Sequence, residues 1–216
     1  MTDKELIDQL YETYGEEIVV TEKLPQAYCP GGIEAVKAIY LGCDPTNNSY
    51  KIEFDHAFAH GYEGAEFKQL VKAHTEQLKA IGLNWDTVYA QNLCRNYFKD
   101  ETGVNKIWKK VAGEFWIERL KEELSVFDLE IPVLLTSQLL LGVLGDKETS
   151  RYIAPEIYEG KIEIPIPSAK NKLGRPLIPL YRGKSSRYKV SYHLKYPQWE
   201  KYKESIKEFL KIENVQ

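Results

Sequence analysis

The sequence predicts an α/β fold, a three-layer α/β/α sandwich around a central, mostly parallel sheet of four strands. Short apolar runs at about 36–42, 85–91, 131–137 and 188–193 have the length and the β-branched and aromatic content of buried strands. Segments with helical spacing of apolar residues separate these runs. Strands that alternate with helices are typical of a parallel sheet with helices on both faces.

The same spacing gives the positions of the helices. We expect a first helix at about 3–14, a second at 64–81, a third at 105–124 and a closing helix at 198–210. His74 lies in the apolar stripe of the second helix, so we expect a core or boundary histidine there. The proline-rich stretch from about 151 to 187 is expected to be extended.

The composition is that of an ordinary globular protein, with 43% hydrophobic and 28% charged residues, and we expect one domain over residues 1–216. No apolar run approaches the roughly 20 residues of a membrane span, and the first residues do not resemble a signal peptide. We therefore expect a cytoplasmic protein without a membrane partner, and a monomer. Cys29, Cys43 and Cys94 form no C-x-x-C pair, so we expect no disulfide framework, iron–sulfur cluster, zinc site or other cofactor.

Polar residues follow three of the predicted strands. The run VKAIYLGCDP at 36–45 ends on Gly-x-Asp-Pro, which puts Asp44 at the carboxyl edge of the sheet, where open α/β sheets bind their ligands. The second strand leads to Asn92 and the last to His193. A carboxylate that positions water, an amide that reads a base edge and an imidazole that stabilises negative charge together suit hydrolysis of a glycosidic C–N bond.

Each of these residues also has a purely structural interpretation. Asp before Pro often caps a turn, which is the alternative role for Asp44. Asn92 is equally well explained as a turn residue at a strand end, and His193 as a boundary histidine held by a backbone carbonyl.

Four segments, in this order, resemble the motifs of the uracil-DNA glycosylase superfamily: LGCDPT at 41–46, VYAQNLCR at 88–95, VLLTSQLLLGVLG at 133–145 and VSYHLKYP at 190–197. The likeness covers roughly residues 33–210. It implies a DNA base-excision glycosylase that hydrolyses the N-glycosidic bond of uracil or another damaged base, with damaged DNA as its partner.

The resemblance also implies roles for single residues. Asp44 would position or activate the attacking water, Asn92 would hydrogen-bond the Watson–Crick edge of the base, and His193 would donate to the O2 of the leaving uracil. The chain departs from the family pattern at Thr46, where a tyrosine or glycine is common. It also departs after His193, where Leu-Lys-Tyr-Pro stands in place of Pro-Ser.

Further residues follow from the same resemblance. Phe54, or as second choice Phe58, would stack on the flipped base, and Cys43 would line its pocket. Leu194 would be the wedge that fills the space vacated by the base.

The charge of the chain, −3 overall, is unevenly distributed. Residues 1–160 carry 16 Lys and Arg against 27 Asp and Glu, whereas residues 161–203 carry 11 against 2. This basic stretch is interleaved with tyrosines and predicts a phosphate-facing surface, unless it is a solvated loop that offsets acidic helices. Its basic residues include Lys170, Lys172, Arg175, Arg182, Lys184, Arg187, Lys189 and Lys195, of which we expect Arg182, Lys184, Arg187 and Lys195 to contact DNA.

Two other functions remain open. One is a nucleic-acid-binding protein of the same fold with altered catalytic residues, which the sequence after His193 would permit. The other is a metal-dependent hydrolase, suggested by Asp55, His56 and His60, because two histidines four residues apart can share one helical face.

Overall fold

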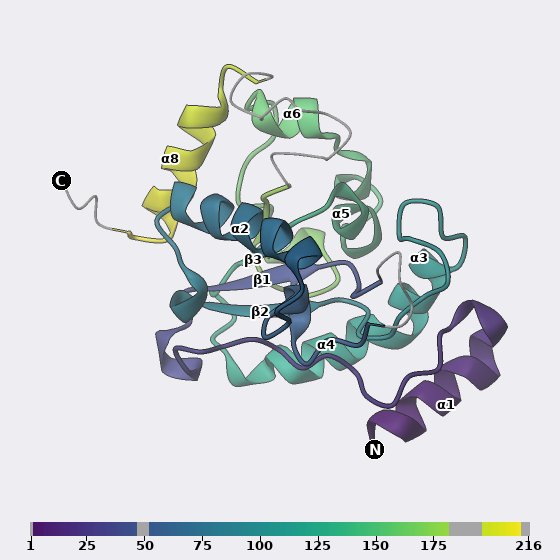
Figure 1. Ribbon diagram of the computed structural model, residues 1–216. Helices are drawn as coiled ribbons and strands as arrows, with labels where there is room; N and C mark the ends of the chain where they lie inside the picture. The colour runs from purple at the N-terminus through teal and green to yellow at the C-terminus, as the bar shows by residue number, and fades with distance from the viewer. Residues whose placement is uncertain (1, 47–51, 182–195, 213–216) are drawn as a thin grey trace.

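The computed structural model describes residues 2–46, 52–181 and 196–212, and it has the predicted α/β fold (Figure 1). Its four strands are β1 (Ala38–Gly42), β2 (Val88–Asn92), β3 (Val133–Leu135) and β4 (Leu177–Pro179). They form one sheet in the order β2-β1-β3-β4, and all three pairings are parallel. The predicted strands at 36–42, 85–91 and 131–137 are confirmed within a few residues.

The helices surround this sheet. They are α1 (Asp3–Tyr14), α2 (Ala65–Ala80), α3 (Trp108–Val111), α4 (Ile117–Glu123), α5 (Gln138–Leu144), α6 (Ala154–Tyr158) and α8 (Trp199–Phe209). A π-helix at Ala112–Trp116 joins α3 to α4, so the predicted helix at 105–124 is real but irregular. Within the described residues, no helix has the length and apolar character to cross a membrane.

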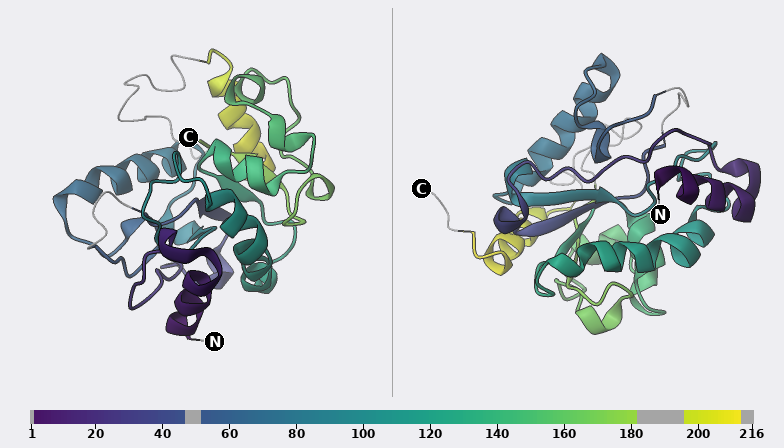
Figure 2. Two further views of the ribbon diagram at one scale, coloured as in Figure 1. Left: turned by 90° about the vertical axis from the view of Figure 1, so that its right-hand side faces the viewer. Right: turned by 90° about the horizontal axis from the view of Figure 1, so that it is seen from below.

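Helices lie on both faces of the sheet (Figure 2, right). Tyr40 of β1 points to α2, where its hydroxyl lies 2.6 Å from His74 Nδ1 and donates to Gln77 Oε1 at 3.2 Å. Because neighbouring strand residues point to opposite faces, Ile39 and Leu41 lie on the side covered by α4. All three strand residues are fully buried.

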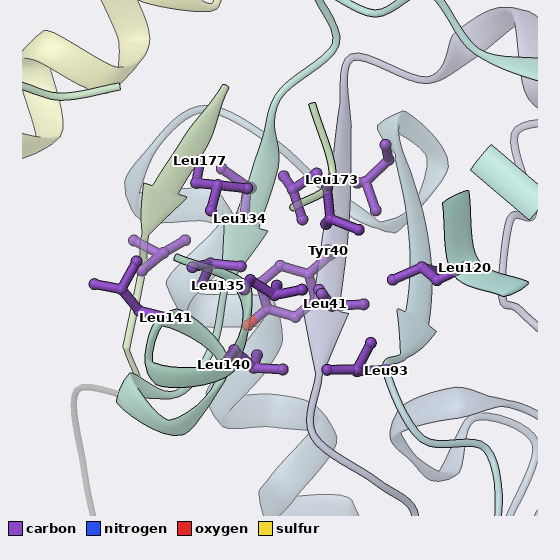
Figure 3. Packing of buried hydrophobic residues seen from close by; sticks show 14 of the residues in the cluster. Tyr40, Leu41, Leu93, Leu120, Leu134, Leu135, Leu140, Leu141, Leu173 and Leu177 are labelled. Carbon is purple, nitrogen blue, oxygen red and sulfur yellow. The ribbon is translucent and has the colours of Figure 1, made fainter. Parts of the chain in front are cut away.

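The core is packed mainly with aliphatic side chains. Figure 3 shows the strands running in one direction and leucines from β3, β4 and α5 gathered around β1. Leu134, Leu135, Leu140, Leu141 and Leu177 are fully buried. This packing fixes the strands and so fixes the position of everything at their carboxyl ends.

The fourth strand differs from the prediction. It is Leu177–Pro179, within the 151–187 stretch that we expected to be extended but not part of the sheet. A strand of three residues beside a proline is too short to show the alternation of apolar and polar residues by which strands are recognised. The sequence therefore does not predict this strand. The strand predicted at 188–193 lies outside the described residues.

The structure also corrects part of the prediction for the basic stretch. Arg175 is buried, and its guanidinium donates to the backbone carbonyls of Leu124 at 2.6 Å, Phe127 at 2.8 Å and Asp128. The ammonium group of Lys172 donates to a backbone carbonyl, that of Val143, at 2.7 Å. A phosphate-facing role is therefore wrong for Arg175, because internal acceptors hold its buried guanidinium. Lys172 is exposed, so its phosphate-facing role stays a prediction.

The rest of that stretch divides in two. Tyr181 and Tyr196 are each 4% exposed and belong to the core. The DNA-contacting residues that we predicted all lie outside the described residues, namely Arg182, Lys184, Arg187, Leu194 and Lys195.

Candidate functional site

A cleft of about 720 Å³ opens at the carboxyl ends of β1, β2 and β3. Its volume is within the range of ordinary small-molecule sites, about 300–1,000 Å³. The walls come from strand ends, from aromatic rings and from the loop before α3. They include Gly42, Cys43, Asp44, Thr46, Phe54, Phe58, Phe67, His74, Asn92, Glu101, Thr102, Gly103, Thr136 and Ser137.

The strand register brings Asn92 into this cleft. Gly42 and Asn92 are directly paired at the ends of β1 and β2. A Cβ atom on Gly42 would lie 2.2 Å from Asn92 Oδ1 and 3.0 Å from Phe58 Cζ. The absence of a side chain at Gly42 thus lets the amide and the aromatic ring lie against the end of β1. Asp44 follows two residues later and lines the same space.

Asp44 is half-buried, and hydrogen bonds fix its carboxylate. Oδ1 accepts from the backbone N–H of Thr46 at 2.9 Å, and Oδ2 accepts from the Thr102 hydroxyl. The first bond is the turn-capping interaction of Asp before Pro. Asp44 therefore caps a turn and also faces the cleft, so the two interpretations do not exclude each other.

The surroundings of Asp44 shift its titration. Burial raises the pKa of Asp44 above its usual value, because the ionised form is desolvated. The hydrogen bonds from Thr102 and Thr46 oppose this shift. Desolvation has the larger effect, so the carboxylate loses its charge at a higher pH than an exposed aspartate does.

Thr102 is a site residue that sequence analysis missed. It lies in the loop between β2 and α3, which turns back at Glu101 through hydrogen bonds from the amides of Val104 and Asn105. The amide of Phe98 donates to Thr46 Oγ1 at 3.0 Å, and this contact ties the start of the loop to the turn that follows β1. A lone threonine in a polar loop carries no recognisable local signal.

Two aromatic residues predicted to stack on a base both line the cleft. Phe58 lies against Gly42 and Asn92, and its ring is 4.8 Å from that of His74 in an edge-on arrangement. Phe54 belongs to a small outer cluster, where it packs edge-on against Phe67 at 4.8 Å. Phe58, our second choice from sequence, is therefore the ring beside the Asn92 amide.

The backbone at Phe58 is strained. Phe58 has φ 59° and ψ 24°, and the next residue, Ala59, has φ 59°. Such left-handed conformations are uncommon for residues other than glycine and cost on the order of 1–3 kcal/mol each. Strain of this kind concentrates at functional sites, and here it orients a ring that lines the cleft.

Two more predicted residues have clear positions. His74 is 2% exposed, which confirms a core histidine, and it also forms part of the cleft wall. Cys43 is half-buried and lines the cleft beside Asp44.

The residues of the metal hypothesis have other partners. The Asp55 carboxylate pairs with Lys23. His60 stacks on Tyr28 at 3.8 Å between ring centroids, and burial lowers the pKa of His60 to about 4. His56 meets the same tyrosine edge-on at 5.7 Å. Over residues 2–46, 52–181 and 196–212, no group of three or more His, Cys, Asp and Glu side chains could hold a metal ion.

The cleft therefore brings together five of the predicted site residues, namely Cys43, Asp44, Phe54, Phe58 and Asn92. His193 lies outside the described residues, and its place beside Asp44 stays a prediction. Fold and site define an α/β protein with a partly polar cleft at the carboxyl edge of a parallel sheet. No protein-family model matches the chain, and a search of the curated proteins finds no match to it.

Proposed function

We propose that this protein is a DNA glycosylase that hydrolyses the N-glycosidic bond of uracil or another damaged base. The observation that carries the proposal is the meeting of Asp44, two residues after β1, and Asn92, the last residue of β2, in one cleft beside Phe58. Carboxylate, amide and aromatic ring are the groups that water activation, base recognition and base stacking require.

In the proposed reaction, a flipped nucleotide enters the cleft and its base stacks on Phe58. The Asn92 side chain, which offers both a donor and an acceptor, pairs with the base edge. Asp44 orients a water molecule toward the sugar carbon. As the glycosidic bond breaks, its electron pair moves to the base nitrogen, and Asp44 takes a proton from the attacking water.

The neighbours of Asp44 support this role. Thr46 and Thr102 hold the two carboxylate oxygens, so the side chain is oriented before the substrate arrives. The raised pKa brings Asp44 closer to neutral pH, where a general base is most effective. As the pH is lowered, the excision rate should therefore begin to fall at a pH above the usual pKa of an aspartate.

A specific observation favours the alternative, a nucleic-acid-binding protein of this fold without hydrolysis. Both oxygens of Asp44 already accept hydrogen bonds from the protein. An aspartate that only stabilises its turn would have the same partners.

An excision assay separates the two functions. Purified protein is incubated with labelled oligonucleotides that contain uracil, hypoxanthine, xanthine or a mismatch, and alkali then cleaves the strand wherever a base is lost. Asp44→Asn should lower the excision rate about 10²-fold or more and change oligonucleotide affinity little, because the carboxylate acts mainly in the transition state.

Asp146→Asn is the matched control. Asp146 Oδ1 also accepts the amide of the second residue after it, Glu148, and a threonine hydroxyl, that of Thr149, but Asp146 does not line the cleft. This variant should excise like the wild type. If the wild-type protein binds oligonucleotides but releases no base from the whole panel, the binding protein is the correct function.

A further inference from the structure

A second hollow, of about 450 Å³, lies along α2 next to the cleft. We propose that this groove, which we call the α2 groove, binds the phosphates of the nucleic-acid strand whose base enters the cleft; the inference rests on the proposed function. Its walls include Ala59, His60, Lys68, Lys72, Glu76 and Lys79.

Charge is the first argument. Lys68, Lys72 and Lys79 are exposed along one side of α2, against a single acidic residue of the groove, Glu76. Among the described residues, none of these three ammonium groups forms an ion pair or a hydrogen bond. Unpaired lysines gathered along a hollow attract a polyanion, because each bound phosphate releases condensed counterions.

Three lysines on other helices pair with a glutamate of the same helix. Lys121 on α4 pairs with Glu118 three residues before it. On α8, two more lysines form the same kind of pair, Lys203 with Glu200 and Lys207 with Glu204. Lys121, Lys203 and Lys207 are therefore matched controls for the lysines of the α2 groove, which have no such partner among the described residues.

Position is the second argument. Ala59 lines both the α2 groove and the cleft. Helix α2 contributes Phe67 and His74 to the cleft, and from its adjoining side it contributes Lys68 and Lys72 to the groove. A strand that places one nucleotide in the cleft can therefore continue along α2.

The length of the groove fits such a strand. From Lys68 to Lys79 the helix covers about three turns, roughly 16 Å. At about 3.4 Å for each nucleotide of a stacked strand, this distance corresponds to roughly five nucleotides. Three lysines along it can neutralise three phosphates.

His60 also lines the α2 groove. It is 8% exposed, and its Nε2 atom is buried and has no hydrogen-bond partner in the part of the chain that the structure describes. With a pKa of about 4, lowered mainly by burial, the imidazole is neutral at pH 7. The neutral imidazole adds no cation to the groove, so its positive charge comes from the three lysines.

The test measures binding of a fluorescent single-stranded oligonucleotide over a range of salt concentrations. The groove variant combines Lys68→Gln, Lys72→Gln and Lys79→Gln. The control variant makes the same change of charge at the paired lysines, with Lys121→Gln, Lys203→Gln and Lys207→Gln.

The groove variant should bind at least about tenfold more weakly at low salt. Its plot of log affinity against log salt should be less steep by about 2, because each lost phosphate contact removes about 0.7 from the slope. The control variant should keep the slope of the wild type. With the substrates that the wild type cleaves, the groove variant should show a raised KM and an unchanged kcat, since the cleft is intact.

Equal losses in both variants, or no loss in either, would overturn the α2 groove as a phosphate site. Excision by the wild type would leave the proposed function standing in both cases. Conversely, a groove variant that loses binding, in a protein that releases no base, supports the groove and overturns the glycosylase. A wild-type protein that binds no oligonucleotide overturns both.

Discussion

Asp44 and Arg175 are both charged residues removed from water, but the protein surrounds them differently. Arg175 is 2% exposed and donates to three backbone carbonyls near the end of α4. Asp44 is half-buried, accepts two hydrogen bonds and lines an open cleft. The arginine is enclosed by the fold, whereas the carboxylate faces space that a ligand can fill.

The difference separates a structural charge from a candidate functional one. The chain after a helix end lacks the regular hydrogen bonds of the helix, and the Arg175 guanidinium donates to three carbonyls just after the end of α4. Burial lowers the pKa of Arg175 and raises that of Asp44, so in both cases it disfavours the ionised form. Only the aspartate combines this cost with access to a ligand, and such a combination is typical of functional sites.

The largest expected effect on stability is at Arg175. Arg175→Met should lower the free energy of unfolding by about 3 kcal/mol or more, because it removes three hydrogen bonds that a buried charged donor makes. Urea unfolding measures the loss. Arg151→Met, at an exposed arginine, should stay within about 0.5 kcal/mol of the wild type. A loss below about 1 kcal/mol at Arg175 would mean that water replaces the guanidinium.

Gly42→Ala tests whether the cleft depends on the close approach at the end of β1. The new Cβ would lie 2.2 Å from Asn92 Oδ1, so the amide or the strand must move. We expect a loss of about 1–3 kcal/mol in stability and about a tenfold loss in excision. Gly113→Ala, where the new Cβ would meet no atom within 4 Å outside its own helix backbone, should be neutral or stabilising. Equal behaviour of the two variants would contradict the role of Gly42.

Asp44→Asn should not lower the free energy of unfolding at pH 7, in contrast to Arg175→Met. Because the folded-state pKa of Asp44 is raised, this residue favours the folded state less as pH rises from the unfolded pKa through the folded one. The variant should therefore be at least as stable as the wild type at pH 7, and the difference should vanish below about pH 4. Urea unfolding at both pH values checks this, and a clear loss at pH 7 would indicate that Asp44 serves mainly its turn.

The smallest effect is expected at Thr102. Its hydroxyl lowers the pKa of Asp44, so Thr102→Val should raise that pKa further. If the ionised carboxylate is the catalytic form, the acidic limb of the excision rate should move to higher pH. The rate on the plateau should change less. Thr102→Ser keeps the hydroxyl and should restore the wild-type profile, whereas identical profiles for all three proteins would exclude this contact as a determinant.

Much of the framework could be predicted from local patterns. The β-branched and aromatic run that ends in Gly-x-Asp-Pro located β1 and put Asp44 at its carboxyl end. The run before Asn92 located β2 in the same way. Helix α1 begins and ends as predicted because Thr2 caps it in a capping box with Glu5, and because its apolar residues recur at helical spacing.

Other features left no local trace. Strand β4 has only three residues and ends on Pro179, and its partner β3 holds it in the sheet. Arg175 had the sequence context of a surface cation, yet carbonyls from a distant helix end bury it. Spacing alone gave no basis for preferring Phe58 to Phe54.

The sequence by itself determined the α/β class, most of the strands and helices, and the polar residues that follow β1 and β2. These features depend on side-chain periodicity and turn chemistry, which act over a few neighbouring residues. Only the tertiary structure decided that Thr102 holds Asp44, that Gly42 makes room for Asn92, and that α2 presents unpaired lysines beside the cleft. Such contacts join residues far apart in the chain, and their geometry is fixed by the packing of the whole core.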